Sequence, residues 1–128
     1  MQQIQPYLQS RQVLRCPSNS ASEFSYFLSC RAAYLEKGAF APIDSRRIQF
    51  PAAFVLAGDT LGFQRFDADK DDYSQNCVGG WENGVPFVPW QRHNRAQNIL
   101  FADGHVKRFA AFNAGSMTFD YATMKSWM

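Results

Sequence analysis

The sequence predicts an α+β fold in which a helix lies across an antiparallel β-sheet, and three features support this prediction. An apolar run, the dipeptide Asp103-Gly104 and an alternating run follow one another, a pattern typical of a β-hairpin over residues 98–109. Residues 52–57 form a short apolar run typical of a buried strand. Residues 4–10 are compatible with a helix. The order of helix, strands, long loop and hairpin is that of an α+β domain.

The first part of the chain passes from a helix-compatible segment through turn formers to an apolar segment. In the predicted helix, Pro6 lies near the start, where proline is tolerated. Residues 16–20 are rich in turn formers, and residues 25–35 are too apolar for a loop and fit either a strand or a helix. Residues 38–42 break this pattern.

A central strand and the hairpin are expected to form the middle of the sheet. The strand lies within residues 48–59 and is predicted to end at Gly58. Asp103 and Gly104 both tolerate the positive φ of a type I′ turn, so residues 98–102 should pair with residues 105–109.

Two further segments lie outside these strands. Residues 60–89 are polar and too long for a plain connection, which is typical of a functional or ligand-held loop. After a turn at residues 113–116, residues 120–127 are predicted to form a terminal helix, capped by Thr118 or Asp120, that packs Tyr121, Met124 and Trp127 on the sheet.

Length and charge restrict the classes of function. A chain of 128 residues, 46% of them hydrophobic, is expected to form one domain over residues 1–128. A formal charge of +2 is too small to indicate binding to nucleic acid or to a membrane surface. Charged residues are unevenly distributed along the chain. This distribution fits either solvated loops and strand faces or head-to-tail packing of subunits. Basic residues near the hairpin are Arg92, Arg95, Lys107 and Arg108, and the acidic residues of the long loop are Asp67, Asp69, Asp71 and Asp72.

Four segments resemble one protein family. In residues 92–109, RHNRAQNILFADGHVKRF, nine residues separate His93 from Asp103-Gly104, and this block is the specific one. Residues 6–20, PYLQSRQVLRCPSNS, are similar to the segment with a Cys-Pro-Ser step that follows the long helix in that family, and SYFLSC and FVLAGDT fit less tightly. On these motifs the chain resembles the prepilin-type processing-associated H-x(9)-DG proteins, which are pseudopilin-like.

The resemblance implies a pilin-like head, with the remnant of an N-terminal helix packed on the sheet, and a non-enzymatic subunit of a type II secretion or type IV pilus-like assembly. Its partners would be other pseudopilin subunits or secretion-system proteins. The head would lie outside the cytoplasm, in the periplasm or at the cell surface. The family starts with an apolar membrane helix, whereas residues 1–5 contain no apolar run. Either such an anchor precedes Met1 in the natural protein, or the natural protein has none.

Three cysteines, Cys16, Cys30 and Cys77, permit one disulfide or none. The extracytoplasmic location implied by the resemblance permits oxidation, and Cys16 with Cys30 is the first pairing we expect. The alternative is three reduced thiols packed as small apolar groups.

The acidic residues of the long loop are a candidate calcium site. Asp67, Asp69 and Asp71 alternate and are followed by Asp72, so several oxygen ligands could face one ion. An EF-hand is excluded because Asp72 stands where that loop requires glycine and Val78 where it requires glutamate. Major pseudopilins are known for a looser calcium loop, so the resemblance implies Ca²⁺ as a structural ion, and a solvated acidic turn is the alternative.

The two histidines raise the question of catalysis. His93 and His105, with Asp103, Asp59 and the thiols, would suit a metal-dependent hydrolase. We disfavour this because His93 precedes the first strand of the hairpin, His105 follows its turn, and no nucleophile motif accompanies them. In the family His93 looks like a structural residue that bonds backbone groups before the hairpin, and the turn alone explains Asp103.

The aromatic residues of the long loop allow one more function. They fit the core, a subunit interface, or a surface that stacks on sugars, in that order of preference. We therefore expect a pseudopilin-like structural subunit that is not an enzyme, with a secreted calcium-stabilised carbohydrate-binding module as the alternative. The aromatic residues are Tyr73, Trp81, Phe87 and Trp90.

Overall fold

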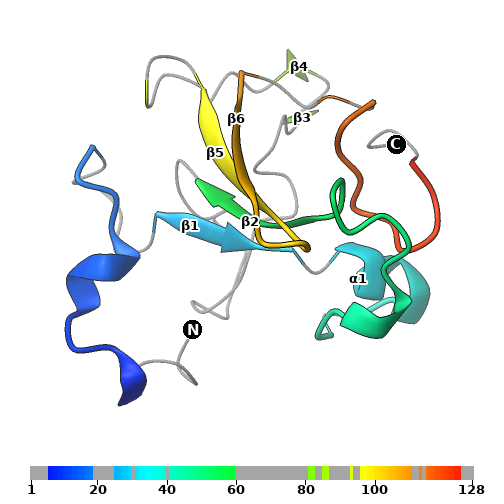
Figure 1. The fold of residues 1–128 in the computed structure, drawn as a ribbon, viewed down its shortest axis with the longest axis horizontal. Helices are drawn as coiled ribbons and strands as arrows, with labels where there is room; N and C mark the ends of the chain where they lie inside the picture. The colour runs from blue at the N-terminus through cyan, green and yellow to red at the C-terminus, as the bar shows by residue number, and fades with distance from the viewer. Residues whose placement is uncertain are drawn as a thin grey trace.

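The core of the protein is a four-stranded antiparallel β-sheet with little helix (Figure 1). The computed structural model describes residues 6–18, 25–29, 31–39, 41–59, 81–82, 85–86, 93, 96–110, 113 and 115–124. The strands lie in the order β1-β2-β5-β6, so β2 and β5 are central. The prediction of α+β with an antiparallel sheet is confirmed at this level. The strands are β1 (Tyr26–Leu28), β2 (Val55–Asp59), β5 (Gln97–Phe101) and β6 (Val106–Phe109).

Strand β2 is the predicted central strand, shifted toward its C-terminal end. It pairs with β1 through Tyr26↔Asp59 and with β5 through Gly58↔Ile99. Residues 51–53 form a turn, and the strand runs through Gly58 to Asp59. Gly58 therefore does not end the strand. A side chain would not fit there, because an added Cβ would lie 2.7 Å from both Phe27 Cε1 and Ile99 Cδ1.

The predicted hairpin is present, but its turn type and register were predicted incorrectly. The loop has three residues, 102–104, and is closed by hydrogen bonds from Gly104 N to Phe101 O and from Phe101 N to His105 O, both of 3.0 Å. Gly104 has φ +93° whereas Asp103 does not have positive φ, so the turn is not type I′. The extra loop residue shifts the pairing by one, to Asn98↔Arg108.

Two apolar clusters lie in the described part of the molecule. The larger cluster joins the sheet to the C-terminal segment, and the smaller one joins Ala32 of α1 (Arg31–Lys37) to Phe54 and Tyr121. The rings of Phe54 and Tyr121 stack with centroids 6.0 Å apart. Of the twelve phenylalanines of the sequence, Phe27, Phe54, Phe101 and Phe119 are buried in these clusters. The larger cluster comprises Phe27, Val55, Ile99, Phe101, Met117 and Phe119.

The C-terminal segment follows β2 instead of forming the predicted helix. Val55 N donates to Thr118 O at 3.0 Å, and Thr118 N donates to Ala53 O at 2.9 Å, so residues 117–119 lie beside the start of β2. Residues 120–124 are not helical. Tyr121 is buried as predicted, and its hydroxyl accepts a 2.9 Å hydrogen bond from Asp44 N. Trp127 lies outside the described residues.

The N-terminal part differs from the expected helix remnant. Residues 6–10 are not α-helical, and a 3-10 helix, η2 (Arg11–Leu14), follows them. Tyr7 is 85% exposed, so it does not pack on the sheet. The segment for which strand and helix were both open contains both, since β1 is followed by α1. A second 3-10 helix, η3 (Ser45–Arg47), has Asp44 as its N-cap.

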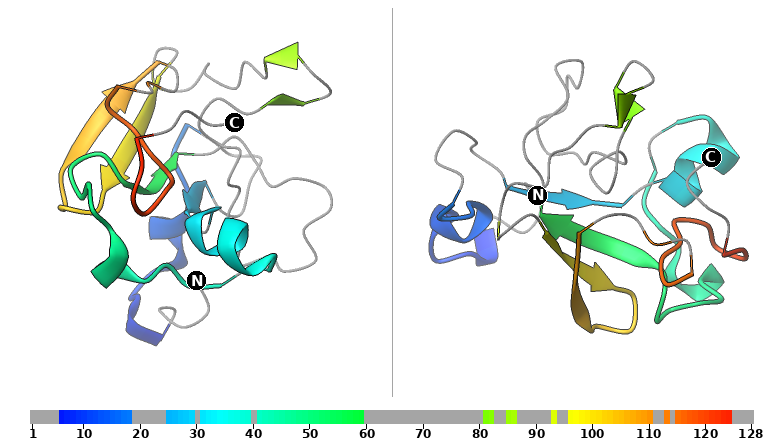
Figure 2. Two further views of the ribbon diagram at one scale, coloured as in Figure 1. Left: turned by 90° about the vertical axis from the view of Figure 1, so that its right-hand side faces the viewer. Right: turned by 90° about the horizontal axis from the view of Figure 1, so that it is seen from above.

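Only two short strands of the predicted long loop are described. β3 (Trp81–Glu82) and β4 (Val85–Pro86) form a separate two-stranded antiparallel ribbon, which is labelled in Figure 1 and seen from two further sides in Figure 2. Within the ranges that the structure describes, no helix is long and apolar enough to cross a membrane.

Candidate functional site at His93

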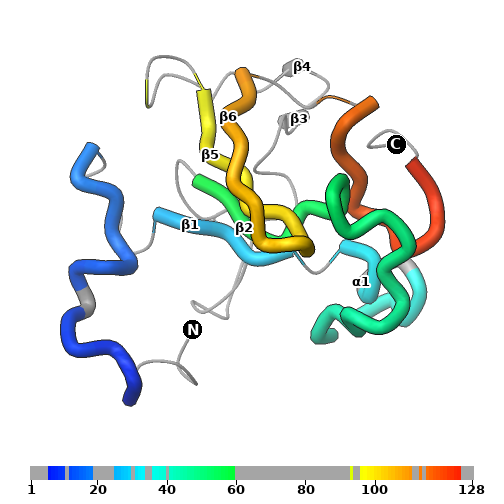
Figure 3. The backbone as a smooth tube through the Cα atoms, viewed as in Figure 1, coloured from blue at the N-terminus to red at the C-terminus, as the bar shows by residue number. Residues whose placement is uncertain are grey.

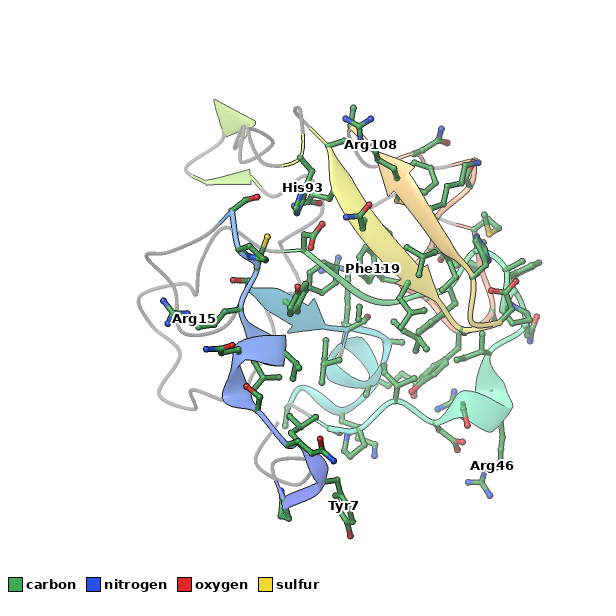
Figure 4. All side chains as sticks on the ribbon, turned by 60° about the vertical axis from the view of Figure 1, so that its left-hand side comes forward. Tyr7, Arg15, Arg46, His93, Arg108 and Phe119 are labelled. Atoms are coloured by element: carbon green, nitrogen blue, oxygen red, sulfur yellow. The ribbon has the colours of Figure 1, made fainter. Side chains whose placement is uncertain are left out.

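The side chains of Cys16, Asp59 and His93, which are far apart in the sequence, lie close together in the structure. Its Nε2 lies 3.3 Å from the Sγ of Cys16 and 3.6 Å from the Oδ2 of Asp59. Cys16 comes from the N-terminal segment and Asp59 from the end of β2, and both are buried. Figure 4 shows His93 near the end of the β5–β6 hairpin that also carries Arg108. We call Cys16, Asp59, His93 and Asn98 the His93 cluster.

The sheet holds Asp59 in place. Its Oδ2 accepts hydrogen bonds from the backbone N of Asn98, at 2.8 Å, and from Asn98 Nδ2, at 3.0 Å. Asp59 is the last residue of β2 and Asn98 is the second residue of β5, so these two bonds connect neighbouring strands. A buried carboxylate is costly unless it is hydrogen-bonded, and Asn98 provides two donors for it.

The backbone of His93 is held from the far strand of the hairpin. Arg108 Nη2 donates a 2.7 Å hydrogen bond to His93 O. His93 has φ +47°, the left-handed region that non-glycine residues seldom occupy. Arg108 lies opposite Asn98 in the β5–β6 register. Two strands therefore contact His93: β6 bonds its backbone through Arg108, and β2 places Asp59 at its ring.

The surroundings of the cluster disfavour additional negative charge. Tyr26, which pairs with Asp59 across the strands, has its pKa raised, first by burial and then by the nearby Cys16 and Asp59. Its phenol therefore stays protonated to higher pH than a solvated tyrosine.

The arrangement of the cluster is that of packed polar groups and differs from a Cys–His–Asp triad. A triad requires the nucleophile at one ring nitrogen of histidine and the carboxylate at the other. Here the sulfur of Cys16 and the carboxylate of Asp59 both face Nε2 of His93. The ring consequently cannot pass a proton from one side to the other along this path. Among the described residues, no group of three or more His, Cys, Asp or Glu is arranged to hold a metal ion.

The second histidine belongs to the hairpin tip and does not join His93. His105 stacks on Phe101 with centroids 4.4 Å apart, and its Nδ1 lies 2.6 Å from Asp103 Oδ1. Asp103 Oδ1 also accepts from His105 N at 3.1 Å. These interactions lower the pKa of Asp103, with the backbone hydrogen bond as the largest cause and the side-chain bond next. Asp103 and Gly104 thus lie in the hairpin turn, as the sequence predicts, although the turn is a three-residue loop and not type I′.

The lowered pKa of Asp103 predicts a pH-dependent contribution to stability. Asp103→Asn keeps a good turn residue and removes the charge, so it should lower the melting temperature at pH 7. The folded-state pKa is below the unfolded one, so the contribution is present above the ordinary carboxyl range and is lost as pH falls through the folded pKa. Melting curves of the wild type and Asp103→Asn from pH 7 to pH 2 should therefore converge at the acid end. A gap that persists at pH 2 would contradict this assignment.

The other predicted site residues fall into two groups. Cys16 is a free thiol whose Sγ faces His93 Nε2, and its predicted partner Cys30 lies outside the described residues. The candidate calcium ligands also lie outside the described residues, as do Cys77 and most of the aromatic residues of the long loop. The calcium ligands are Asp67, Asp69, Asp71 and Asp72.

Sequence reasoning missed Asn98 and the central position of Asp59. The available signal was an acidic residue at the end of an apolar strand, in FVLAGDT, because such a residue needs a hydrogen-bond donor when the strand is buried. The donor could not be identified, because Asn98 comes beside Asp59 through the pairing of β2 with β5, a contact between residues 39 positions apart that no local pattern specifies.

Searches against protein-family models, curated proteins and solved structures found no match for this chain.

Proposed function

We propose that the chain is a non-enzymatic, pseudopilin-like structural subunit whose described sheet belongs to an extracytoplasmic, pilin-like head. One observation carries this proposal: the His93 cluster brings together residues from three segments that carry the family resemblance. Cys16 comes from the Cys-Pro-Ser segment, Asp59 from FVLAGDT and His93 from the H-x(9)-DG block. Contact between the three segments gives one structural reason why their motifs occur together in this sequence.

The contacts of the cluster fit a structural role for the H-x(9)-DG spacing. His93 lies before β5 and Asp103 lies after it, so the nine residues between them include the whole strand. His93 O is bonded by Arg108 of β6, and Asp103 closes the tip with His105. The two ends of the motif thus lie where the hairpin begins and where it turns. A head domain that contacts neighbouring subunits needs such rigid elements to hold its surface residues in place.

The experiment that tests the proposal is site-specific photo-crosslinking in cells that contain a type IV pilus-like or type II secretion system. A photoreactive amino acid at Val106, an exposed residue of edge strand β6, should give crosslinks to further copies or to other pilin-like subunits. The control places the same amino acid at Tyr7, which is exposed on the N-terminal segment. A chain that gives no subunit crosslink from either position, and binds a glycan array, would instead support the carbohydrate-binding module.

Calcium binding is a separate prediction from this function. If Asp67, Asp69, Asp71 and Asp72 hold Ca²⁺, a concentration of the ion one hundred times Kd should stabilise the native state by about 2.7 kcal/mol. Thermal unfolding with millimolar Ca²⁺ should then show a higher melting temperature than with EDTA. Asp69→Ala should abolish the difference. An equal shift in Asp69→Ala, or no shift at saturating calcium, would leave the segment a solvated acidic turn.

A further inference from the structure

The N-terminal segment, residues 6–18, is joined to the rest of the described structure by few buried side chains. Leu14 and Cys16 are 6% and 4% exposed, whereas Tyr7 and Val13 are 85% and 56% exposed. In Figures 1 and 3 the segment lies along one side of the sheet, at the end of the molecule opposite α1. Figure 4 shows Tyr7 directed away from the sheet. We call residues 6–18 the strap.

The strap has its own internal hydrogen bonds, and its attachments include contacts at Leu14 and Cys16. Gln12 N donates to Ser10 Oγ at 3.2 Å, and Arg15 N donates to Gln12 O at 3.1 Å. These two contacts are the 2.9 Å bond from Ser25 N to Leu14 O and the contact of Cys16 Sγ with His93 Nε2.

The His93 cluster has two parts: the Asn98–Asp59 bonds within the sheet, and the contact of Cys16 of the strap with His93. The bonds from Asn98 to Asp59 lie within the sheet and do not involve the strap. The apolar cluster that joins β1, β2 and β5 to the C-terminal segment contains no strap residue. Separation of the strap from the sheet therefore breaks the Cys16–His93 contact and the hydrogen bond from Ser25 N to Leu14 O and uncovers two side chains, whereas the bonds and the core of the sheet stay in place. Segments with few buried apolar contacts open at a lower free energy than core strands.

We propose that the strap opens and closes on the sheet as a unit, with the Cys16–His93 contact as its latch and Leu14 as its apolar anchor. In the closed state the thiol of Cys16 is covered. In the open state the thiol is accessible to solvent while the four-stranded sheet remains folded. The strap thereby gives the chain a conformational change that is local to the segment preceding the sheet, in addition to any function of the head.

The test is alkylation of the native chain by iodoacetamide, quantified on the peptide that contains Cys16, through a urea series below the unfolding transition. Amide hydrogen exchange at Ile99 in β5 reports global opening in the same samples. The opening that exposes Cys16 to alkylation should have a lower free energy than the opening that permits exchange at Ile99. Its urea dependence should also be weaker, because a local opening exposes little surface. Alkylation that follows Ile99 exchange, with the full urea dependence of global unfolding, would overturn the proposal.

Variants at the two histidines test the latch itself. His93→Gly removes the imidazole and accepts the positive φ of this position without strain. It should raise the alkylation rate of Cys16 by roughly five- to tenfold, the effect of losing one modest polar contact, while exchange at Ile99 is unchanged. His105→Ala removes the histidine of the hairpin tip and should leave the rate unchanged. An unchanged rate in folded His93→Gly would show that His93 is not the latch, and if this variant does not fold, the urea series on the wild type decides.

Discussion

Replacing Gly58 by alanine is expected to destabilise the sheet by about 3 kcal/mol, which is the upper part of the usual range for overpacking in a core. The new Cβ would lie 2.7 Å from both Ile99 Cδ1 and Phe27 Cε1, and 3.0 Å from the backbone oxygen of Asn98. Phe27 and Ile99 are 1% and 0% exposed, so neither side chain can turn into solvent to relieve the contact. The midpoint of urea unfolding, followed by far-UV circular dichroism, measures the loss.

The matched control for Gly58 is Gly115→Ala. Gly115 has one neighbour within 4 Å of an added Cβ, Asn113 Oδ1 at 3.4 Å, which is an ordinary contact. This variant should shift the free energy of unfolding by no more than about 0.5 kcal/mol, as surface substitutions usually do. Equal shifts in Gly58→Ala and Gly115→Ala would show that β1, β2 and β5 are not packed as described.

Replacing Asp59 by alanine should destabilise the domain by about 2 kcal/mol, because the substitution removes a buried carboxylate that accepts two hydrogen bonds from Asn98. The backbone N–H and Nδ2 of Asn98 both donate to Asp59 Oδ2 and so connect β5 to β2. The ring of His93, which faces the same oxygen at 3.6 Å, also loses its carboxylate neighbour. The loss is measured by urea unfolding at pH 7.

Asp59→Asn separates the hydrogen bonds from the charge. Asparagine has nearly the same shape and keeps one oxygen that can accept from Asn98, so it should cost less than alanine. If Asp59→Asn were as destabilising as Asp59→Ala, the carboxylate charge facing His93 would be the dominant interaction. If both variants were as stable as the wild type, the described bonds of Asp59 would not contribute to the fold.

The strands of the sheet illustrate how far a sequence pattern can be followed. The apolar run before Asp103-Gly104 and the alternating run after it predict the hairpin correctly, because both patterns are local. The pairing within the hairpin was wrong by one residue, because it depends on whether Asp103 adopts positive φ. That choice depends on the loop bonds of Phe101 with Gly104 and His105, which the pattern of apolar residues does not contain.

The C-terminal segment shows the opposite limit. Residues 120–124 have a helix-compatible spacing of apolar side chains, yet they are not helical. Hydrogen bonds of Thr118 with Ala53 and Val55 hold the preceding residues extended beside β2, and Tyr121 stacks on Phe54. Tertiary contacts of this kind outweigh a helix propensity of a few tenths of a kcal/mol per residue.

By itself, the sequence determined the local features of this protein: a hairpin around Asp103-Gly104, an apolar central strand within residues 48–59, and His93 as a residue of interest ahead of the hairpin. Periodicity and turn chemistry act over a few residues, so these features can be read from neighbouring letters. Only the tertiary structure decided that Cys16 and Asp59 meet at the same nitrogen of His93. The residues of this cluster are 77 positions apart from Cys16 to His93 and 39 from Asp59 to Asn98, and such contacts depend on how the strands pack, which no local pattern specifies.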